Sequence, residues 1–315
     1  MFHYPSPVSS PARGEESHLE DGVLLMEKFI KNIFTVLAFA SLLFMAGIII
    51  VLFKESFLAL KELNLFHFIF GKAWYPTHNP PEFGVLALIA GSLVVSFTAM
   101  LVCIPLGLGS ALYLHEIAGE KQRKILKPII EILSSIPSII FGFFGLVVIA
   151  PFLQKTFDLP TGLSVLTAGV VLGVMTIPII CSMTEDALSF VPRSFREASY
   201  ALGANRFQTL FFVIIPAAAS GISTAVILAV SRLMGETMIV LMVAGGAAVM
   251  PASLFSPARP MTSTIAAEMG ETAAGSLHFS ALFLIALILF FITLILNLIS
   301  ERVSKKYRLK LGQGR

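Results

Sequence analysis

Six stretches of this chain are almost free of charged residues, and each is long enough to cross a lipid bilayer. About 20 helical residues, at about 1.5 Å each, cover a hydrocarbon core about 30 Å thick. Charged residues make up 13% of the chain and hydrophobic residues 56%, with a mean hydropathy of +0.88, as is typical of polytopic membrane proteins. We therefore predict an all-α integral membrane protein with six transmembrane helices, at residues 33–53, 85–114, 129–153, 163–183, 217–243 and 280–299.

Proline and glycine residues mark two of these spans. The third contains Pro137, Gly142 and Gly145, so we expect its helix to be kinked or broken and buried against protein. The fourth carries Gly169 and Gly173 at GxxxG spacing, which predicts close packing against another helix.

The polar segments predict three regions and an orientation. Residues 1–27, rich in proline and acidic side chains, are expected to form a disordered cytoplasmic tail, followed by a six-span membrane domain at 28–300 and a basic cytoplasmic tail at 301–315. Most of the 22 Lys and Arg residues fall in the two tails, the loop between spans two and three, and residues 191–216. Because basic residues collect on the cytoplasmic side, both termini and residues 191–216 are predicted to be cytoplasmic.

Residues 191–216 form a charged stretch between two spans, and its sequence predicts a helix-turn-helix. The first helix should cover about residues 192–202, because proline suits a first helical turn. Gly203 suits the left-handed residue that ends a helix. Asn205 can then cap a second helix, with Gln208 completing a capping box.

The same stretch resembles the loop of bacterial ABC importer permeases written EAA, three residues, G, nine residues, I-x-L-P. The matching positions are Glu197, Ala198, Gly203, Val213, Ile215 and Pro216, with Ser199, Val213 and Ile215 as mild departures. In that family the loop docks into a groove of a separate cytoplasmic ATPase, so the resemblance implies that Arg193, Glu197, Ala198 and Gly203 lie at this joint. The alternative is an ordinary amphipathic loop in which Glu197 pairs with Arg193 at i, i+4.

The chain carries no pattern of an enzyme site. The phosphate-binding loop pattern fails around Gly71 and Lys72, and HExxH, GxSxG and clustered Cys/His patterns are missing. Cys103 and Cys181 fall inside spans and are expected to be small hydrophobic residues. We therefore expect a non-catalytic protein that has no cofactor of its own and binds no nucleic acid; ATP and Mg would be bound by a partner ATPase.

Arg232 is the only basic residue within a predicted span, and Glu236 follows it by one turn. A basic side chain inside the membrane costs at least about 2.5 kcal/mol, so it should face a partner or a polar cavity. Ser231 and Thr237 add hydroxyls. We weigh two readings, a structural Arg232–Glu236 ion pair and a site on the translocation path of an anion.

Five segments resemble PstC-type permease subunits of the phosphate-specific ABC importer, within the MetI-like permease family. They are FGVLALIAGSLVVS, IEILSSIPSIIFGFFGLVV, EDALSFVPRSFREASYALGA, SRLMGETMIVLMVAG and TSTIAAEMGE. The resemblance covers residues 74–297. It implies a six-span subunit in the bacterial cytoplasmic (inner) membrane that pairs with a PstA-type permease, two PstB-type ATPase subunits and an extracytoplasmic PstS-type phosphate-binding protein. Segments 54–83 and 245–279 would face the binding protein.

Three other functions stay open at this stage. An ABC permease for sulfate, molybdate or phosphonate would share the coupling loop. A secondary transporter or channel would also suit an intramembrane Arg–Glu pair, although no internal repeat is evident. A scaffold that senses phosphate without transporting it is the third.

Overall fold

The computed structural model describes residues 13–310 of the chain. The chain divides after Lys54 into two units, and each is described by itself. The first unit is occupied by most of helix α1 (Arg13–Glu62), whose part from Met26 onward is apolar enough to cross a membrane. The disordered tail expected at 1–27 is thus helical from Arg13, where Glu and Leu favour a helix, and residues 1–12 lie outside the described part.

The second unit is almost entirely helical. A short hairpin pairs β1 (Trp74–Tyr75) with β2 (Glu82–Phe83). The α-helices are α2 (Leu65–Phe70), α3 (Leu86–Leu112), α4 (Glu120–Ser135), α5 (Ser138–Phe144), α6 (Ala150–Thr156), α7 (Val165–Ser189), α8 (Arg193–Ala201), α9 (Arg206–Thr209), α10 (Ile215–Met234), α11 (Met238–Val243), α12 (Met261–Glu268) and α13 (Leu277–Lys310). Three π-helical turns join some of them: η1 (Tyr113–Ile117), η2 (Gly145–Ile149) and η3 (Leu210–Ile214).

Six helical segments of the described chain are long and apolar enough to cross a membrane, as the sequence predicts. They are Met26–Glu62, Leu86–Ile117, Ser138–Thr156, Val165–Ser189, Arg206–Met234 and Leu277–Ile299.

All six spans differ somewhat from their predicted bounds, and in two of them a helix breaks inside the predicted range. The third begins at Ser138, because the helix breaks at Ile136 and Pro137, so residues 129–135 belong to the preceding helix α4. The break itself is confirmed. The prediction of one continuous helix at 217–243 is wrong: α10 ends at Met234, Gly235 follows, and α11 is a separate helix.

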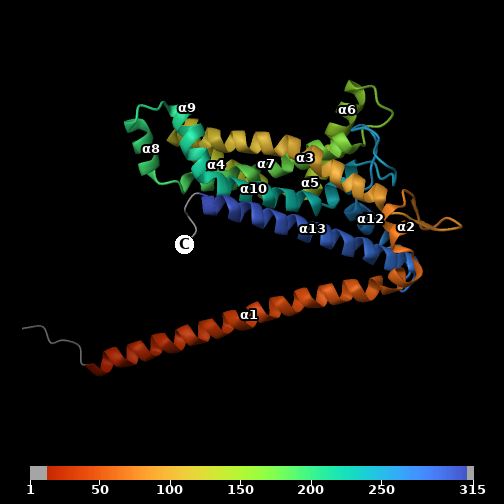
Figure 1. The fold of residues 1–315 in the computed structure, drawn as a ribbon, viewed down its shortest axis with the longest axis horizontal. Coiled ribbons are helices and arrows are strands. Elements are labelled where there is room, and N and C mark those ends of the chain that lie inside the picture. The colour runs from red at the N-terminus through yellow and green to blue at the C-terminus, as the bar shows by residue number, and fades with distance from the viewer. Residues whose placement is uncertain (1–12, 311–315) are drawn as a thin grey trace, which may run out of the picture. The chain divides into compact units, whose positions relative to one another are not determined.

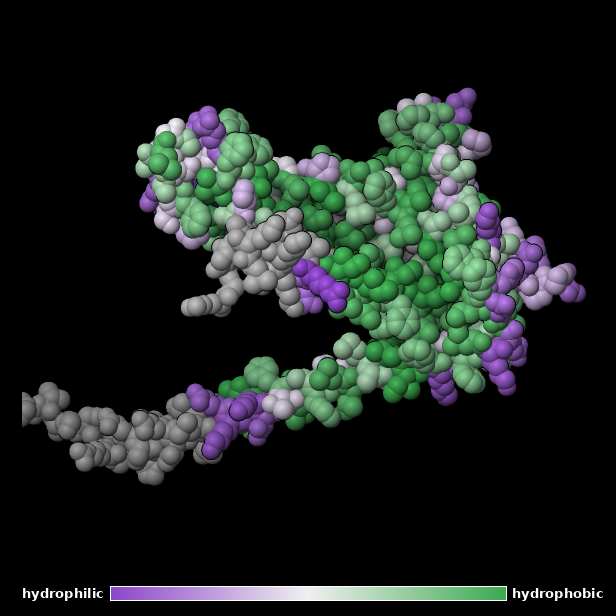
Figure 2. Space-filling view, viewed as in Figure 1, coloured by the Kyte–Doolittle hydropathy of each residue, from purple (hydrophilic) through white to green (hydrophobic). Residues whose placement is uncertain are grey.

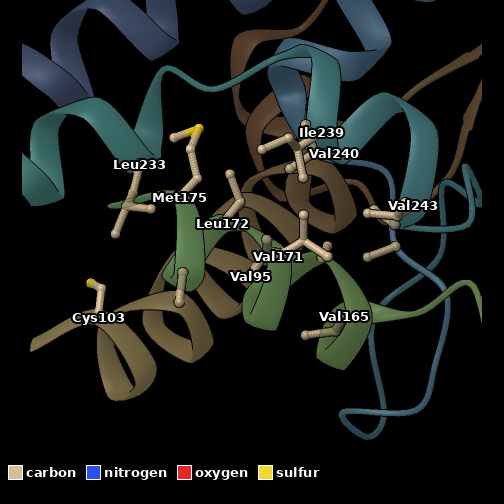
Figure 3. Packing of buried hydrophobic residues seen from close by; sticks show 14 of the residues in the cluster. Val95, Cys103, Val165, Val171, Leu172, Met175, Leu233, Ile239, Val240 and Val243 are labelled. Atoms are coloured by element: carbon tan, nitrogen blue, oxygen red, sulfur yellow. The ribbon is translucent and has the colours of Figure 1, made fainter. Parts of the chain in front are cut away.

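Close packing of α3 against α7 forms the centre of the second unit (Figure 3). A Cβ added to Gly169 would lie 2.5 Å from Thr98 Cγ2, and one added to Gly173 would lie 2.6 Å from Val102 Cβ. The packing role expected of this glycine pair is confirmed. The core cluster around them takes in residues from α3, α7, α10 and α11, with Ala258 from the segment before α12.

The second unit has two distinct ends. Helices α8 and α9 lie at one end, together with the C-terminal part of α13, whereas α6, α12 and the hairpin lie at the other (Figure 1). Figure 2 shows hydrophobic residues over the middle of this unit and hydrophilic residues gathered mainly toward its ends. This distribution suits a bundle that crosses a membrane.

Candidate functional site

Local sequence signals shape the stretch at 191–216 as predicted. Helix α8 ends at Ala201, Leu202 is its C-cap, and Gly203 follows with φ of 84°, in the left-handed region. Asn205 Oδ1 accepts a hydrogen bond from Gln208 N at 2.9 Å, and Gln208 Oε1 accepts one from Asn205 N at 2.8 Å. This capping box starts α9, which continues through η3 into α10. The helix-turn-helix is confirmed.

Several exposed residues of this stretch have side chains that form no hydrogen bond or ion pair within the described chain. Arg193, Glu197 and Ala198 are exposed, and within the described chain the Arg193–Glu197 ion pair does not form. Two apolar side chains are also exposed, Leu202 at 89% and Phe207 at 67%. Bare apolar residues at the tip of a polar helical turn are typical of a surface that another protein covers.

The inner face of α8 is held by side chains that sequence reasoning did not select. Arg196 donates two hydrogen bonds to the Glu116 carboxylate, one from Nη1 to Oε2 at 3.2 Å and a shorter one from Nη2 to Oε1. The same Nη2 donates to His115 Nε2 at 2.7 Å. Ser199 and Thr209 hydroxyls lie 2.9 Å apart and join α8 to α9. The signal available in the sequence was Glu116, a carboxylate at the end of an apolar span; in the structure its side chain is only 4% exposed.

A second buried carboxylate lies nearby on α7. Glu185, with a side chain 1% exposed, accepts hydrogen bonds from Arg123 and from Lys127 Nζ, the latter at 2.6 Å. Lys127 also contacts Asp186 Oδ1 at 3.1 Å. The hydrogen bond to Glu185 raises the pKa of the Lys127 ammonium, so this ion pair stays charged at neutral pH. The basic loop after span two is thereby joined to the end of span four.

Arg232 and Glu236 do not form the expected ion pair in the described structure. Their i, i+4 spacing would need a continuous helix, but α10 ends at Met234, so Glu236 lies beyond its end. Glu236 Oε1 instead accepts a hydrogen bond from Met238 N at 3.2 Å, in the first turn of α11. Arg232 is exposed, and no acidic partner within the described chain neutralises it.

The two predicted hydroxyl residues have separate environments. Ser231 Oγ donates to Asn297 Oδ1 on α13 and lies 3.1 Å from Ile227 O. Thr237 Oγ1 donates to the carbonyl of Gly235 at 3.3 Å, within the break between α10 and α11. The structure therefore keeps the four predicted path residues near the end of α10 without joining them into one hydrogen-bonded group.

A cavity of about 700 Å³ opens at the end of the bundle opposite α8. Arg259, Glu268 and His278 line it, with Trp74 from the hairpin. Glu268 is central: its carboxylate accepts from Trp74 Nε1, from Arg259 Nη1 at 2.8 Å and from His278 Nε2 at 2.8 Å.

Among residues 13–310, the described side chains form no group of His, Cys, Asp or Glu that could hold a metal ion. Cys103 and Cys181 are free and buried, and burial in apolar surroundings is the environment expected of small hydrophobic residues.

Residues 103–309 match the family model described as "Binding-protein-dependent transport system inner membrane component". The chain belongs to this family. Among its relatives, the phosphate transport system permease protein PstC of Mesorhizobium japonicum is 35% identical over 290 residues, which cover 86% of this chain and 88% of the relative. A probable ABC transporter permease protein, YqgH of Bacillus subtilis, is 38% identical over 252 residues, covering 80% and 81% of the two chains.

Solved structures agree with this membership at the level of the fold. A chain of the MetNI methionine ABC transporter matches with a TM-score of 0.53 at 23% identity, covering 71% of this permease and 94% of that chain. A chain of a bacterial alginate ABC transporter in complex with a periplasmic protein matches with a TM-score of 0.62 at 14% identity, covering 92% and 96%. The permease is thus a multi-pass membrane protein with the MetI-like fold.

Proposed function

We propose that this permease is a transmembrane subunit of an ATP-driven importer of inorganic phosphate. The observation that carries the proposal is its similarity, over most of its length, to relatives named phosphate transport system permease protein PstC. The exposed surface of α8 supports coupling to a separate ATPase, because Arg193, Glu197 and Ala198 are left free for a partner.

The rest of the importer follows from this role. A second, PstA-type permease would complete the path across the membrane, and two PstB-type ATPase subunits would bind ATP and Mg. A PstS-type binding protein would deliver phosphate to the end that holds the 700 Å³ cavity. The basic residues predict that α8 and both termini face the cytoplasm.

Arg232 is the residue that we assign to the anion path, together with Ser231, Glu236 and Thr237. Its guanidinium is exposed on α10 and is not neutralised by any described acidic side chain, so its donors are available to a tetrahedral oxyanion. Glu236, half-buried beyond the end of α10, would accept the hydroxyl of a protonated phosphate.

The test is uptake of radiolabelled phosphate by proteoliposomes that contain the whole complex, ATP and the binding protein. Excess unlabelled phosphate should abolish the signal, whereas sulfate, molybdate and phosphonate should leave it unchanged. Equal competition by sulfate would assign the permease to another oxyanion. Uptake that persists without the ATPase would identify a secondary transporter.

A further inference from the structure

A continuous chain of hydrogen-bonded side chains runs from α8 to α7. It does not include Arg193, Glu197 and Ala198, the exposed residues of α8 that we assign to docking of the ATPase. Arg196 on α8 donates to Glu116 and to His115 Nε2. Because a guanidinium can only donate, His115 Nε2 must be the acceptor, and the ring proton lies on Nδ1. His115 Nδ1 lies 3.4 Å from Ser189 Oγ, which in turn donates to Glu185 Oε1 at 3.2 Å. The chain therefore has one direction, from α8 to η1 to α7.

Salt bridges extend this chain to further elements. Glu185 is paired with Arg123 and Lys127 of α4. Arg206 Nε of α9 lies 3.9 Å from Glu116 Oε2. Both carboxylates are at least nine-tenths buried, so the low local dielectric strengthens these pairs and leaves each costly to break. The five elements can therefore shift relative to one another only by exchanging or losing these contacts.

The exposed side chains of Arg193, Glu197 and Ala198, by contrast, form no hydrogen bond or ion pair with the described spans. Glu197 and Ala198 are exposed, and a Cβ added to Gly203 would have no other atom within 4 Å. A displacement of α8 by a partner must reach the spans through the residues that join α8 to them. Arg196 is the side chain of α8 that forms ion pairs and hydrogen bonds with η1, which continues directly from α3.

We propose that Glu116 and His115 are the positioning residues through which movement of the coupling helix α8 enters span two, with Ser189 and Glu185 passing it to α7 and α4. The inference rests on the proposed coupling of α8 to an ATPase. It assigns transmission to Arg196 and leaves docking to the exposed residues Arg193, Glu197 and Ala198.

The test measures phosphate imported per ATP hydrolysed by the complete complex in proteoliposomes. Glu116→Gln keeps the size and the acceptor oxygen but removes the charge, and Arg196→Lys keeps the charge but lacks the fork that reaches Glu116 and His115 together. Both complexes should retain their ATPase subunits and hydrolyse ATP, while import per ATP falls at least fivefold in Glu116→Gln and less in Arg196→Lys. The matched control is Glu131→Gln. Glu131 is an exposed carboxylate on α4 that is not part of the hydrogen-bonded series, so its substitution should leave the ratio of phosphate imported to ATP hydrolysed unchanged.

Two results would overturn the inference. One is a wild-type ratio in both variants. The other is loss of the ATPase subunits from both, which would make the contact a simple tether. If the wild-type and Glu131→Gln complexes both hydrolyse ATP without importing phosphate, the result counts against the proposed function and not against this inference.

Discussion

The indole Nε1 of Trp74 donates to both carboxylate oxygens of Glu268, at 3.2 and 3.1 Å, across 194 residues of sequence. Trp74 is 1% exposed and lies edge-on to Phe68 and Phe83. The loop before α3 is thus joined to the end of α12 by one carboxylate. Trp74 and Glu268 both line the cavity at the end opposite α8.

Because Trp74 is the only tryptophan of the chain, its fluorescence reports on this contact alone. In Glu268→Gln the indole and Arg259 lose a charged acceptor, and we expect a red-shifted emission and a loss of about 1–3 kcal/mol of local stability. Emission spectra and thermal unfolding in nanodiscs measure both. Glu271→Gln removes an exposed carboxylate from the same cavity and should change neither. Equal shifts in the two variants would show that the cavity charge, and not the hydrogen bond, sets the environment.

The α3–α7 contact predicts opposite effects for two glycines on one helix. A Cβ at Gly107 would lie 2.8 Å from Ile180 Cβ, whereas one at Gly109 would have nothing within 4 Å. We expect Gly107→Ala to destabilise the bundle by about 1–3 kcal/mol through overpacking. Gly109→Ala should be neutral or slightly stabilising, because alanine favours a helix by about 1 kcal/mol. Thermal melts followed by circular dichroism distinguish these outcomes, and equal melting temperatures would contradict the close approach.

Gly203 predicts a test based on backbone conformation alone. Its φ of 84° suits glycine, and a side chain there would find open space, so only the backbone opposes a substitution. Gly203→Val should therefore distort the turn between α8 and α9 and reduce ATPase binding and uptake. Gly203→Asn, which tolerates the left-handed region, should retain most of both. Co-purification of the ATPase and uptake assays measure the two effects. Full activity of the valine variant would show that the turn geometry is not needed.

The sequence predicted local features well because they depend on neighbouring residues. Gly203 and the Asn205–Gln208 capping box lie within six residues of one another, and the structure confirms both. The spans were found by their lack of charge. Their bounds failed where short helices meet, at Pro137 and at Gly235, because tertiary packing decides whether a helix resumes after such a residue.

The inner contacts of the candidate site could not be predicted from spacing. Glu116 and Arg196 are 80 residues apart, and only the fold brings them together. The Arg232–Glu236 pair shows the converse error. Its spacing indicated an ion pair on one helix, but the helix ends between the two residues, so proximity in sequence did not give contact.

The break after α10 leaves Arg232 without an ion-pair partner among the described residues, which allows separate predictions for stability and for phosphate flux. An exposed arginine that forms no ion pair with the described residues gives the fold no such contact to lose, so Arg232→Gln should insert and melt at a temperature no lower than that of wild type. If its guanidinium attracts the anion on the path, phosphate flux should nevertheless fall at least tenfold, and Arg232→Lys should restore part of it. Normal flux in correctly inserted Arg232→Gln would remove the residue from the path.

Glu236 should act on selectivity instead of attraction. Phosphate near neutral pH carries at least one proton, whereas sulfate carries none, so a carboxylate acceptor welcomes the phosphate hydroxyl and repels sulfate. Glu236→Gln keeps an oxygen for the hydrogen bond from Met238 N, so α11 should remain intact. We expect phosphate flux to weaken and sulfate, which wild type is expected to exclude, to become a measurable substrate. Flux of both anions in the same vesicles tests this, with Glu131→Gln, an exposed carboxylate on α4, as the control. A Glu236→Gln variant that still excludes sulfate completely would leave Arg232 as an anion site without a filter beside it.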